Sequence, residues 1–168
     1  MPPSAPPSAK PAQAAAGGWQ DGAHCWPLRV YYEDTDFSGL VYHAAYLRFA
    51  ERGRSEFLRA AGITHRALLR RRSPVAFVVT AMQMRFLAPA RMDDALEVRT
   101  SLRRLGAVRL RMAQEMRRGA ECVWQGTCEL ACIVPEYDAE AQGRARLVRV
   151  PPALREKLAP CLRPETGA

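Results

Sequence analysis

The spacing of hydrophobic and polar positions changes along the chain. Residues 26–33, "WPLRVYYE", combine β-forming residues with partial alternation and predict a first strand. From about Tyr42 to Ala61 apolar residues recur at steps of three and four, which predicts a long helix that ends at Gly62. Apolar residues cover much of this helix, so we expect it to be largely buried. Gly53 within the apolar face indicates the close approach of another backbone.

The second half of the chain has the pattern of strands. A short helix from Thr64 to Arg71, with Thr64 as its cap, is expected first. At the start of residues 75–86, odd- and even-numbered positions are both apolar, which predicts a strand that is covered on both faces. The next segments alternate apolar and polar positions between turn sequences, and they are residues 95–105, 107–118 and 121–134. A last short strand is expected at "ARLVRV", residues 145–150, before a frayed helical tail.

These elements predict an α+β fold, in which one strand and one long helix precede four antiparallel strands. A helix with so wide an apolar face favours a sheet curled around it, and dimerisation is a natural cover for the remaining sheet edges. The Pro/Ala-rich residues 1–24 are expected to be a disordered tail. The domain is expected to span residues 25–150, with residues 151–168 as a C-terminal tail.

Composition narrows the class of protein. A length of 168 residues suits one domain, and no apolar run reaches the roughly 18 residues expected of a transmembrane helix. The N-terminus has no apolar segment typical of a secretory signal.

The cysteine count is odd, at five, and no CxxC pair occurs, which argues against disulfides and zinc and favours the cytoplasm. Cys122, Cys128 and Cys132 are all even-numbered positions of one strand pattern, so they are expected on one buried strand face.

The net charge of +8 suggests an anionic partner, such as nucleic acid, a membrane or a phosphate-bearing small molecule. Of the 25 basic residues, all but Lys10 and Lys157 are arginines, and they are spread along the chain with one dense run at residues 70–72. Aromatic residues are not interleaved with them, as a single-strand-binding surface requires. We therefore expect no nucleic-acid partner.

The strand-to-helix junction, residues 31–46, "YYEDTDFSGLVYHAAY", carries the candidate chemistry. Asp34 and Asp36 lie in the loop, and His43 falls at the first turn of the helix, where backbone N–H groups are unpaired. An oxyanion there would be stabilised by those donors. Gly39 permits a tight turn between carboxylate and donors. A carboxylate, backbone donors and an imidazole are the parts of an acyl-transfer site without a serine or cysteine nucleophile.

Two other interpretations of the junction stay open on these residues alone. Aspartates near a helix start are commonly caps or partners of the helix dipole. A metal could be held by Asp34, Asp36 and His43, although the nearest further nitrogen or sulfur ligand is His65.

A family resemblance favours catalysis. "RVYYEDTDFSGLVYHAAYLRFAERGRSEFLR", Arg29 to Arg59, strongly resembles the YbgC-type acyl-CoA thioesterases of the Tol-Pal gene cluster, which belong with the 4-hydroxybenzoyl-CoA thioesterases in the hotdog superfamily. The likeness continues through Val75 to Val98. The D-x-D pair, the turn glycine, V-Y-H and E-R-G-R all fall at the family's spacing. Phe37 and Ser38 differ from the Gly-rich loop of some relatives.

The resemblance implies a hotdog fold, in which a curved antiparallel sheet wraps the long helix and protomers form homodimers or homotetramers. It implies hydrolysis of acyl-CoA without a metal or cofactor. Asp36 takes the place of the catalytic nucleophile or general base, and the backbone N–H at His43 that of the oxyanion donor. The His43 side chain and Tyr32 would line the pocket. Substrate binding is assigned to Gly39, Val41, Tyr42 and Glu51.

Under this resemblance the expected partners are acyl-CoA, whose phosphates would account for the basic charge, and acyl carrier protein. A hydratase on the same fold is less favoured, because the motif does not match its usual His-plus-acid arrangement. The alternative from a different class is a non-catalytic hotdog partner protein of an acyl-carrier or cell-envelope complex.

Overall fold

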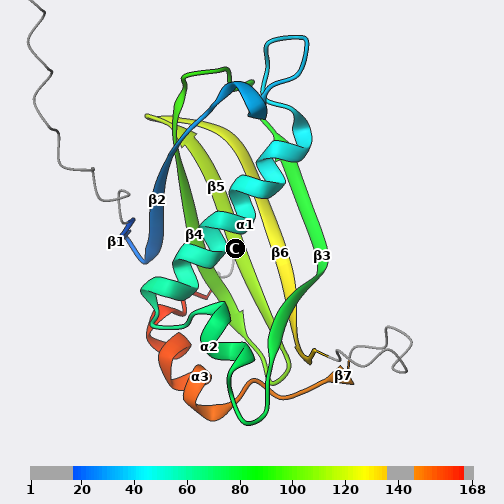
Figure 1. Cartoon of the computed structure of the whole chain (residues 1–168). Helices are drawn as coiled ribbons and strands as arrows, with labels where there is room; N and C mark the ends of the chain where they lie inside the picture. Colours follow the sequence, from blue (N-terminus) through cyan, green and yellow to red (C-terminus); the bar gives the residue numbers. More distant parts are fainter. Residues whose placement is uncertain (1–16, 136–145, 165–168) are drawn as a thin grey trace, which may run out of the picture.

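The computed structural model describes residues 17–135 and 146–164 (Figure 1). Seven strands form one antiparallel sheet in the order β1-β2-β4-β5-β6-β3, with β7 paired to β6. The strands are β1 Gly18–Gln20, β2 Ala23–Arg29, β3 Ala76–Phe86, β4 Ala95–Leu105, β5 Arg109–Arg118, β6 Glu121–Val134 and β7 Arg146–Leu147. The helices are α1 His43–Ala60, α2 His65–Leu69 and α3 Pro152–Leu158, with 3-10 turns η1 Tyr32–Asp34 and η2 Ala159–Cys161.

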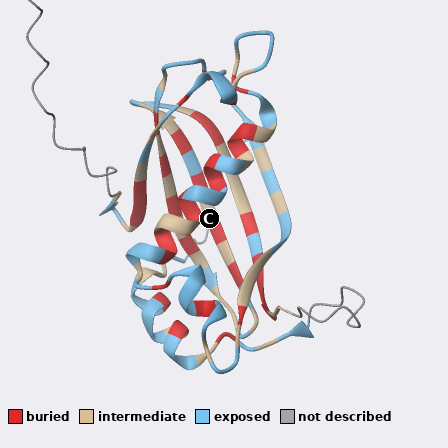
Figure 2. Cartoon of the chain, in the orientation of Figure 1, coloured by how far each residue is buried: buried red, intermediate tan, exposed pale blue. Residues whose placement is uncertain are grey.

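The long helix α1 lies across one face of the curved sheet and packs over β2 and β4 (Figure 1). The α+β class, the helix and the four later strands are as predicted. The prediction that α1 is largely buried is wrong, because the sheet covers one side only and 8 of its 18 residues are buried (Figure 2). A Cβ added at Gly53 would lie 2.5 Å from Val98 Cγ1, so the approach is close, but it is made to side chains rather than to a backbone.

The core has two parts along α1. Around the N-terminal half of α1, Tyr46 and Phe49 pack with Met116 and Trp124. Around its C-terminal half, Phe57 and Leu58 pack with strand residues and with the C-terminal segment.

Between the two parts of the core, a buried Gln114 joins α1 to the sheet. Its Nε2 donates to the Ala50 carbonyl at 2.9 Å and to Thr100 Oγ1 at 3.0 Å. Arg54 Nη1 donates to Gln114 Oε1 at 2.8 Å. These bonds satisfy polar groups that burial would otherwise make costly, and they tie the middle of α1 to β4 and β5.

The N-terminal boundary differs from the prediction. The strand expected at residues 26–33 is β2, which ends at Arg29, and Tyr32–Asp34 form a 3-10 turn instead. Residues 18–24 are not tail, since β1 pairs with β2 and the Trp19 ring lies 5.2 Å from that of Phe57. Asp21 and Gly22 make the two-residue turn, with φ of 50° and 77°. Residues 1–16 of the predicted tail lie outside the described residues.

The C-terminal segment also differs from a frayed tail. Leu154 and Leu158 of α3 are buried, and the Val150 N–H donates to the Ala107 carbonyl at 2.8 Å. The end of the chain therefore completes the core around the C-terminal half of α1 (Figure 2). The short strand predicted in residues 145–150 is present as β7, and Thr64 caps α2 through a 3.2 Å bond from the Ala67 N–H.

The strand β3 is an edge strand paired only with β6 among the described residues. The prediction that it is covered on both faces is wrong for the single chain, since Val79 is 48% exposed and Phe86 51%. Cys128 and Cys132 are buried as predicted, whereas Cys122 is half-buried because the β5–β6 register shifts beside it. Burial raises the pKa of each of these thiols.

Candidate functional site

The loop between β2 and α1 contains two aspartates with different roles. Asp34 is buried, and its Oδ2 accepts a 3.0 Å bond from the Tyr31 N–H. Its carbonyl accepts the Tyr42 N–H at 2.9 Å, and Arg48 Nη2 lies 3.7 Å from its Oδ1. Asp34 therefore holds the loop against the start of the helix.

Asp36 is exposed at the tip of the same loop. A bridge between Thr35 and Val41 closes the loop, and within it the Asp36 N–H donates to the Leu40 carbonyl at 3.0 Å. Gly39 has a φ of 75°, so the expected need for glycine at this turn is confirmed. Hydrogen bonds from Ser38 lower the pKa of the Asp36 carboxyl, and the charge of His43 adds to the effect.

The first turn of α1 leaves backbone donors free. Its N-cap, Tyr42, makes no side-chain capping bond, and the turn has no acidic residue. In residues 17–135 and 146–164, no acceptor lies at the N–H groups of His43 and Ala44. The Tyr42 and His43 rings lie 4.3 Å apart. The start of the helix therefore has free backbone donors, with the positive end of the helix dipole behind them, and such donors can bind an anion.

An apolar hollow of about 300 Å³ borders this helix start. It lies between the first turns of α1 and the segment that follows β3, and its lining residues are Leu40, Val41, His43, Tyr46, Phe86, Leu87, Ala88 and Pro89. The Tyr46 and Phe86 rings meet at 5.3 Å, and Tyr46 Oη accepts the Ala90 N–H at 3.1 Å. Burial raises the pKa of the Tyr46 hydroxyl.

Of the seven predicted site residues, Val41 and His43 line this hollow and the other five do not. Tyr32 is 83% exposed in η1 and does not line it. Glu51 is exposed on α1, where its Oε1 accepts a 2.7 Å bond from Ser55 Oγ, which also lies 3.0 Å from His65 Nε2. Asp36, Gly39, Val41, Tyr42 and His43 remain together around the helix start.

Sequence reasoning missed Tyr46 and Phe86 as candidate site residues. Tyr46 falls among the apolar positions of the predicted helix, and Phe86 contacts it from β3, which is far along the chain. The position of Phe86 at the end of the predicted strand, residues 75–86, was the only local signal.

No set of three or more His, Cys, Asp or Glu side chains is arranged to hold a metal within the part of the chain that the structure describes. Asp34, which the metal interpretation requires, already has the Tyr31 N–H and Arg48 as partners. Within the same described ranges, no helix has the length and apolar character needed to cross a membrane.

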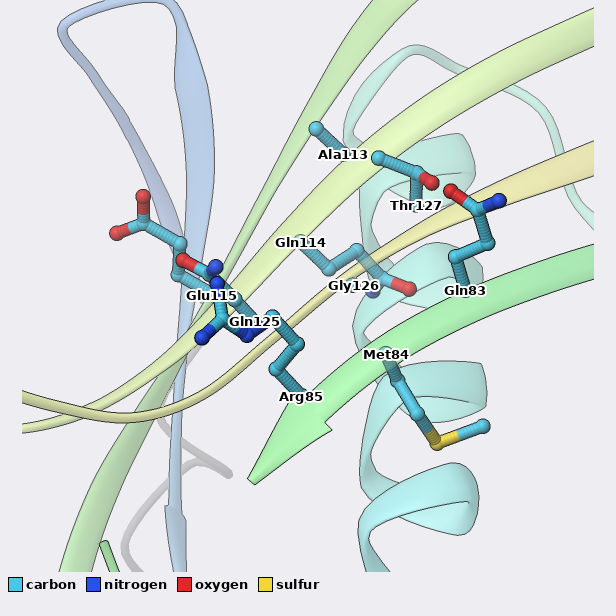
Figure 3. Close-up of a pocket in the computed structure, with 9 residues that line it drawn as sticks. All are labelled: Gln83, Met84, Arg85, Ala113, Gln114, Glu115, Gln125, Gly126 and Thr127. Carbon is cyan, nitrogen blue, oxygen red and sulfur yellow. The ribbon is translucent and has the colours of Figure 1, made fainter. Parts of the chain in front are cut away.

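A second hollow, of about 430 Å³, lies over β3, β5 and β6. Because Met112 and Met116 point into the core, alternation places Ala113 and Glu115 on the opposite, outer face of the sheet. Figure 3 shows Arg85, Glu115 and Gln125 gathered at one end of it, away from Gln83 and Thr127. No residue of the Asp36–His43 segment lines this hollow.

The chain resembles thioesterases in sequence and in fold. The family model of the thioesterase-like superfamily matches residues 30–158. An acyl-CoA thioesterase YbgC of Haemophilus influenzae is 37% identical over 113 residues, which cover 67% of this chain and 82% of that relative. An acyl-CoA thioester hydrolase YbgC of Escherichia coli is 53% identical over 77 residues, which cover 46% of this chain and only 56% of that relative.

A solved structure extends the likeness to the fold. The crystal structure of a probable thioesterase from Bartonella henselae superposes with a TM-score of 0.68 at 39% identity. The superposition covers 77% of this chain and 99% of that one. The hotdog fold implied by the sequence resemblance is thereby confirmed.

Proposed function

This chain belongs to the thioesterase-like superfamily, and we propose that it hydrolyses acyl-CoA thioesters to the free acid and coenzyme A. The observation that carries the proposal is the junction itself. An ionised, exposed Asp36 carboxylate stands on the loop that feeds the unpartnered N–H groups of His43 and Ala44, beside an apolar hollow. The names of the relatives agree with this chemistry.

In the proposed reaction the thioester carbonyl oxygen accepts from the backbone N–H at His43. Negative charge develops on that oxygen in the transition state, where fixed donors and the helix dipole stabilise it most. Asp36 either takes a proton from the attacking water or attacks the carbonyl carbon itself, giving an anhydride that water then opens. In both routes the C–S bond breaks and the coenzyme A thiolate leaves and is protonated. The His43 side chain, which lines the hollow, would border the bound thioester, and Tyr32 would reach substrate only from the exposed turn η1, outside the hollow.

The acyl group is proposed to enter this hollow, with Tyr46 and Phe86 forming part of its wall. Its walls are apolar, and its volume of about 300 Å³ is at the small end for a ligand pocket. Gly39, Val41 and Tyr42 would contact the substrate beside it. Glu51 would contribute only where substrate or a second protomer extends along α1.

A homodimer is proposed as the smallest active unit, with the option of a tetramer. The support is β3, an edge strand of 11 residues whose apolar side chains remain half-exposed in the single chain. Pairing with a second copy would cover them and would bring another protomer close to the hollow. Sedimentation at micromolar concentration should show no stable, active monomer.

The experiment is release of free thiol from a panel of acyl-CoA substrates that varies chain length and includes aromatic acyl groups. Turnover of at least one class by the wild-type chain, and its loss in Asp36→Asn, is the expected result. Absence of turnover across the panel refutes the proposal. If acyl carrier protein then binds without hydrolysis, the non-catalytic partner protein is the better account.

A further inference from the structure

The carboxylate of Asp36 is held asymmetrically by one neighbour. Ser38 approaches Oδ1 twice, since its backbone N–H donates to that oxygen at 2.8 Å and its Oγ hydroxyl donates to the same oxygen. Across the described ranges, Oδ2 of Asp36 has no hydrogen-bond partner. The two oxygens of this carboxylate are therefore chemically distinct before any substrate arrives.

The loop around the pair is itself fixed. The Gly39 N–H donates to the Asp36 carbonyl at 3.0 Å, and the Asp36 N–H donates to Leu40, so both ends of the turn that carries Ser38 are bonded. A second bridge joins Leu40 to Arg91, which connects the loop to the segment before β4. A serine in this turn thus has little freedom to leave the carboxylate.

We propose that Ser38 is a positioning residue for Asp36, whose amide and hydroxyl fix Oδ1 so that Oδ2 is the oxygen presented to the thioester or to its attacking water. This inference rests on the proposed thioesterase function. Ser38 does not touch the reacting atoms, and it acts only through the orientation and ionisation of Asp36.

Two consequences follow for the carboxylate. Donors at Oδ1 stabilise the charged form, so Asp36 stays ionised below its ordinary pKa of 3.8. The side-chain hydroxyl of Ser38 is the largest cause of the lowered pKa, its backbone N–H is the next, and His43 at the start of α1 is the titratable group whose charge adds to them. Removing the hydroxyl should raise the pKa of Asp36 even though the amide bond remains.

The test compares Ser38→Ala with Ser38→Thr, which keeps a hydroxyl on the same carbon. In Ser38→Ala we expect kcat to fall roughly tenfold with KM little changed, because a hydrogen bond to a charged group is lost while the apolar hollow is intact. The acid limb of the kcat profile should move to higher pH, and Ser38→Thr should restore both values. Thiol release is followed with a disulfide reagent that reacts in acid, and circular dichroism checks the fold at each pH.

A titration of the Asp36 carboxyl carbon by nuclear magnetic resonance separates this inference from the proposed function, because it needs no turnover. A raised pKa of Asp36 in Ser38→Ala together with slower hydrolysis supports the positioning role. An unchanged titration, an unchanged acid limb, or a loss of melting temperature with normal kcat overturns it. If the wild-type chain releases no thiol while the titration still shifts, the thioesterase function fails, and the positioning role falls with it.

Discussion

The N-terminal end of α1 faces solvent with free donors, whereas its C-terminal end is closed by hydrogen bonds. At the C-terminal end the Gly62 N–H bonds to Arg59 at 2.9 Å, the Ile63 N–H bonds to Leu58 at 2.8 Å, and Lys157 Nζ donates to the Gly62 carbonyl at 2.7 Å. Helix ends ordinarily need such partners. The hydrogen-bonding groups at the C-terminal end of α1 are thus satisfied within the chain, whereas the free N–H groups at its N-terminal end remain available to a ligand.

Both ends contain a glycine in the left-handed region, with a φ of 75° at Gly39 and 74° at Gly62. At Gly62 the turn ends the helix and leads into the core around Phe57. At Gly39 the turn carries an exposed carboxylate and has no packing atom within 4 Å of an added Cβ, among the described residues. The same left-handed glycine turn therefore closes the helix at one end and, under the proposed function, holds the catalytic carboxylate at the other, so the two ends can be tested with matched variants.

The largest effect is expected from Asp36→Asn at the open end. The variant keeps the shape and removes the charge and basicity, so kcat should fall roughly 100- to 10,000-fold with KM much less affected. The matched control is Asp34→Asn, whose buried carboxylate anchors the loop, and it should lower the melting temperature. Near-wild-type hydrolysis by Asp36→Asn would refute the assignment of the catalytic carboxylate.

The next effect belongs to the closed end. Leu158 is fully buried in α3, so Leu158→Ala should lower the free energy of unfolding by about 2–5 kcal/mol through lost burial and a cavity. Turnover per folded molecule should stay close to normal. Leu69→Ala, at a site 42% exposed, is the control and should change denaturant unfolding little. Equal losses in the two variants would contradict the packing of α3.

Substitution of the two left-handed glycines, Gly39 and Gly62, compares the two ends of α1 directly. Gly62→Ala and Gly39→Ala each place a Cβ at a positive φ, and each should lower stability by about 1 kcal/mol. Only Gly39→Ala should also lower kcat, since relaxing that turn moves Asp36. Thermal unfolding and thiol release measured on both variants check this, and a kcat loss in Gly62→Ala would show that the two ends are coupled.

The smallest effect is expected from His43→Ala. The backbone N–H at position 43 remains, so kcat should fall by less than about tenfold, well short of Asp36→Asn. Loss of the imidazole also removes a charge that lowers the pKa of Asp36, so the acid limb should move slightly to higher pH. A fall as large as that of Asp36→Asn would mean that the side chain, rather than the backbone, carries the role.

Periodicity predicted α1 and the strands β3 to β6 because their apolar faces repeat over ten or more residues. The short hairpin at residues 18–24 was missed, although its Asp21-Gly22 turn is a known hairpin signal, because β1 has only three residues and no alternating pattern. Leu154 and Leu158 are spaced as one helix face, but their packing depends on Phe57 and Leu110, which no local pattern reveals.

The candidate site likewise has a part that the sequence predicts and a part that it does not. Asp36, Gly39 and His43 could be predicted, because a single loop and helix start supply them. The hollow could not, since Phe86 reaches Tyr46 from β3. The hydrogen bonds of Ser38 could not be predicted either, because they depend on the loop conformation, which the spacing of residues in the sequence does not reveal.

The two edges of the sheet differ in length, which bears on how far association can proceed. One edge consists of β1, with three residues, followed by the part of β2 beyond Cys25, and the other is β3, an unbroken strand of 11 residues. A short edge is a poor template for a further strand, while a long apolar edge is a good one. If two β3 edges pair as proposed, each chain has used the one long edge that its described residues offer, so association through the sheet stops at a dimer and does not continue into a fibre, and a tetramer would need a different surface.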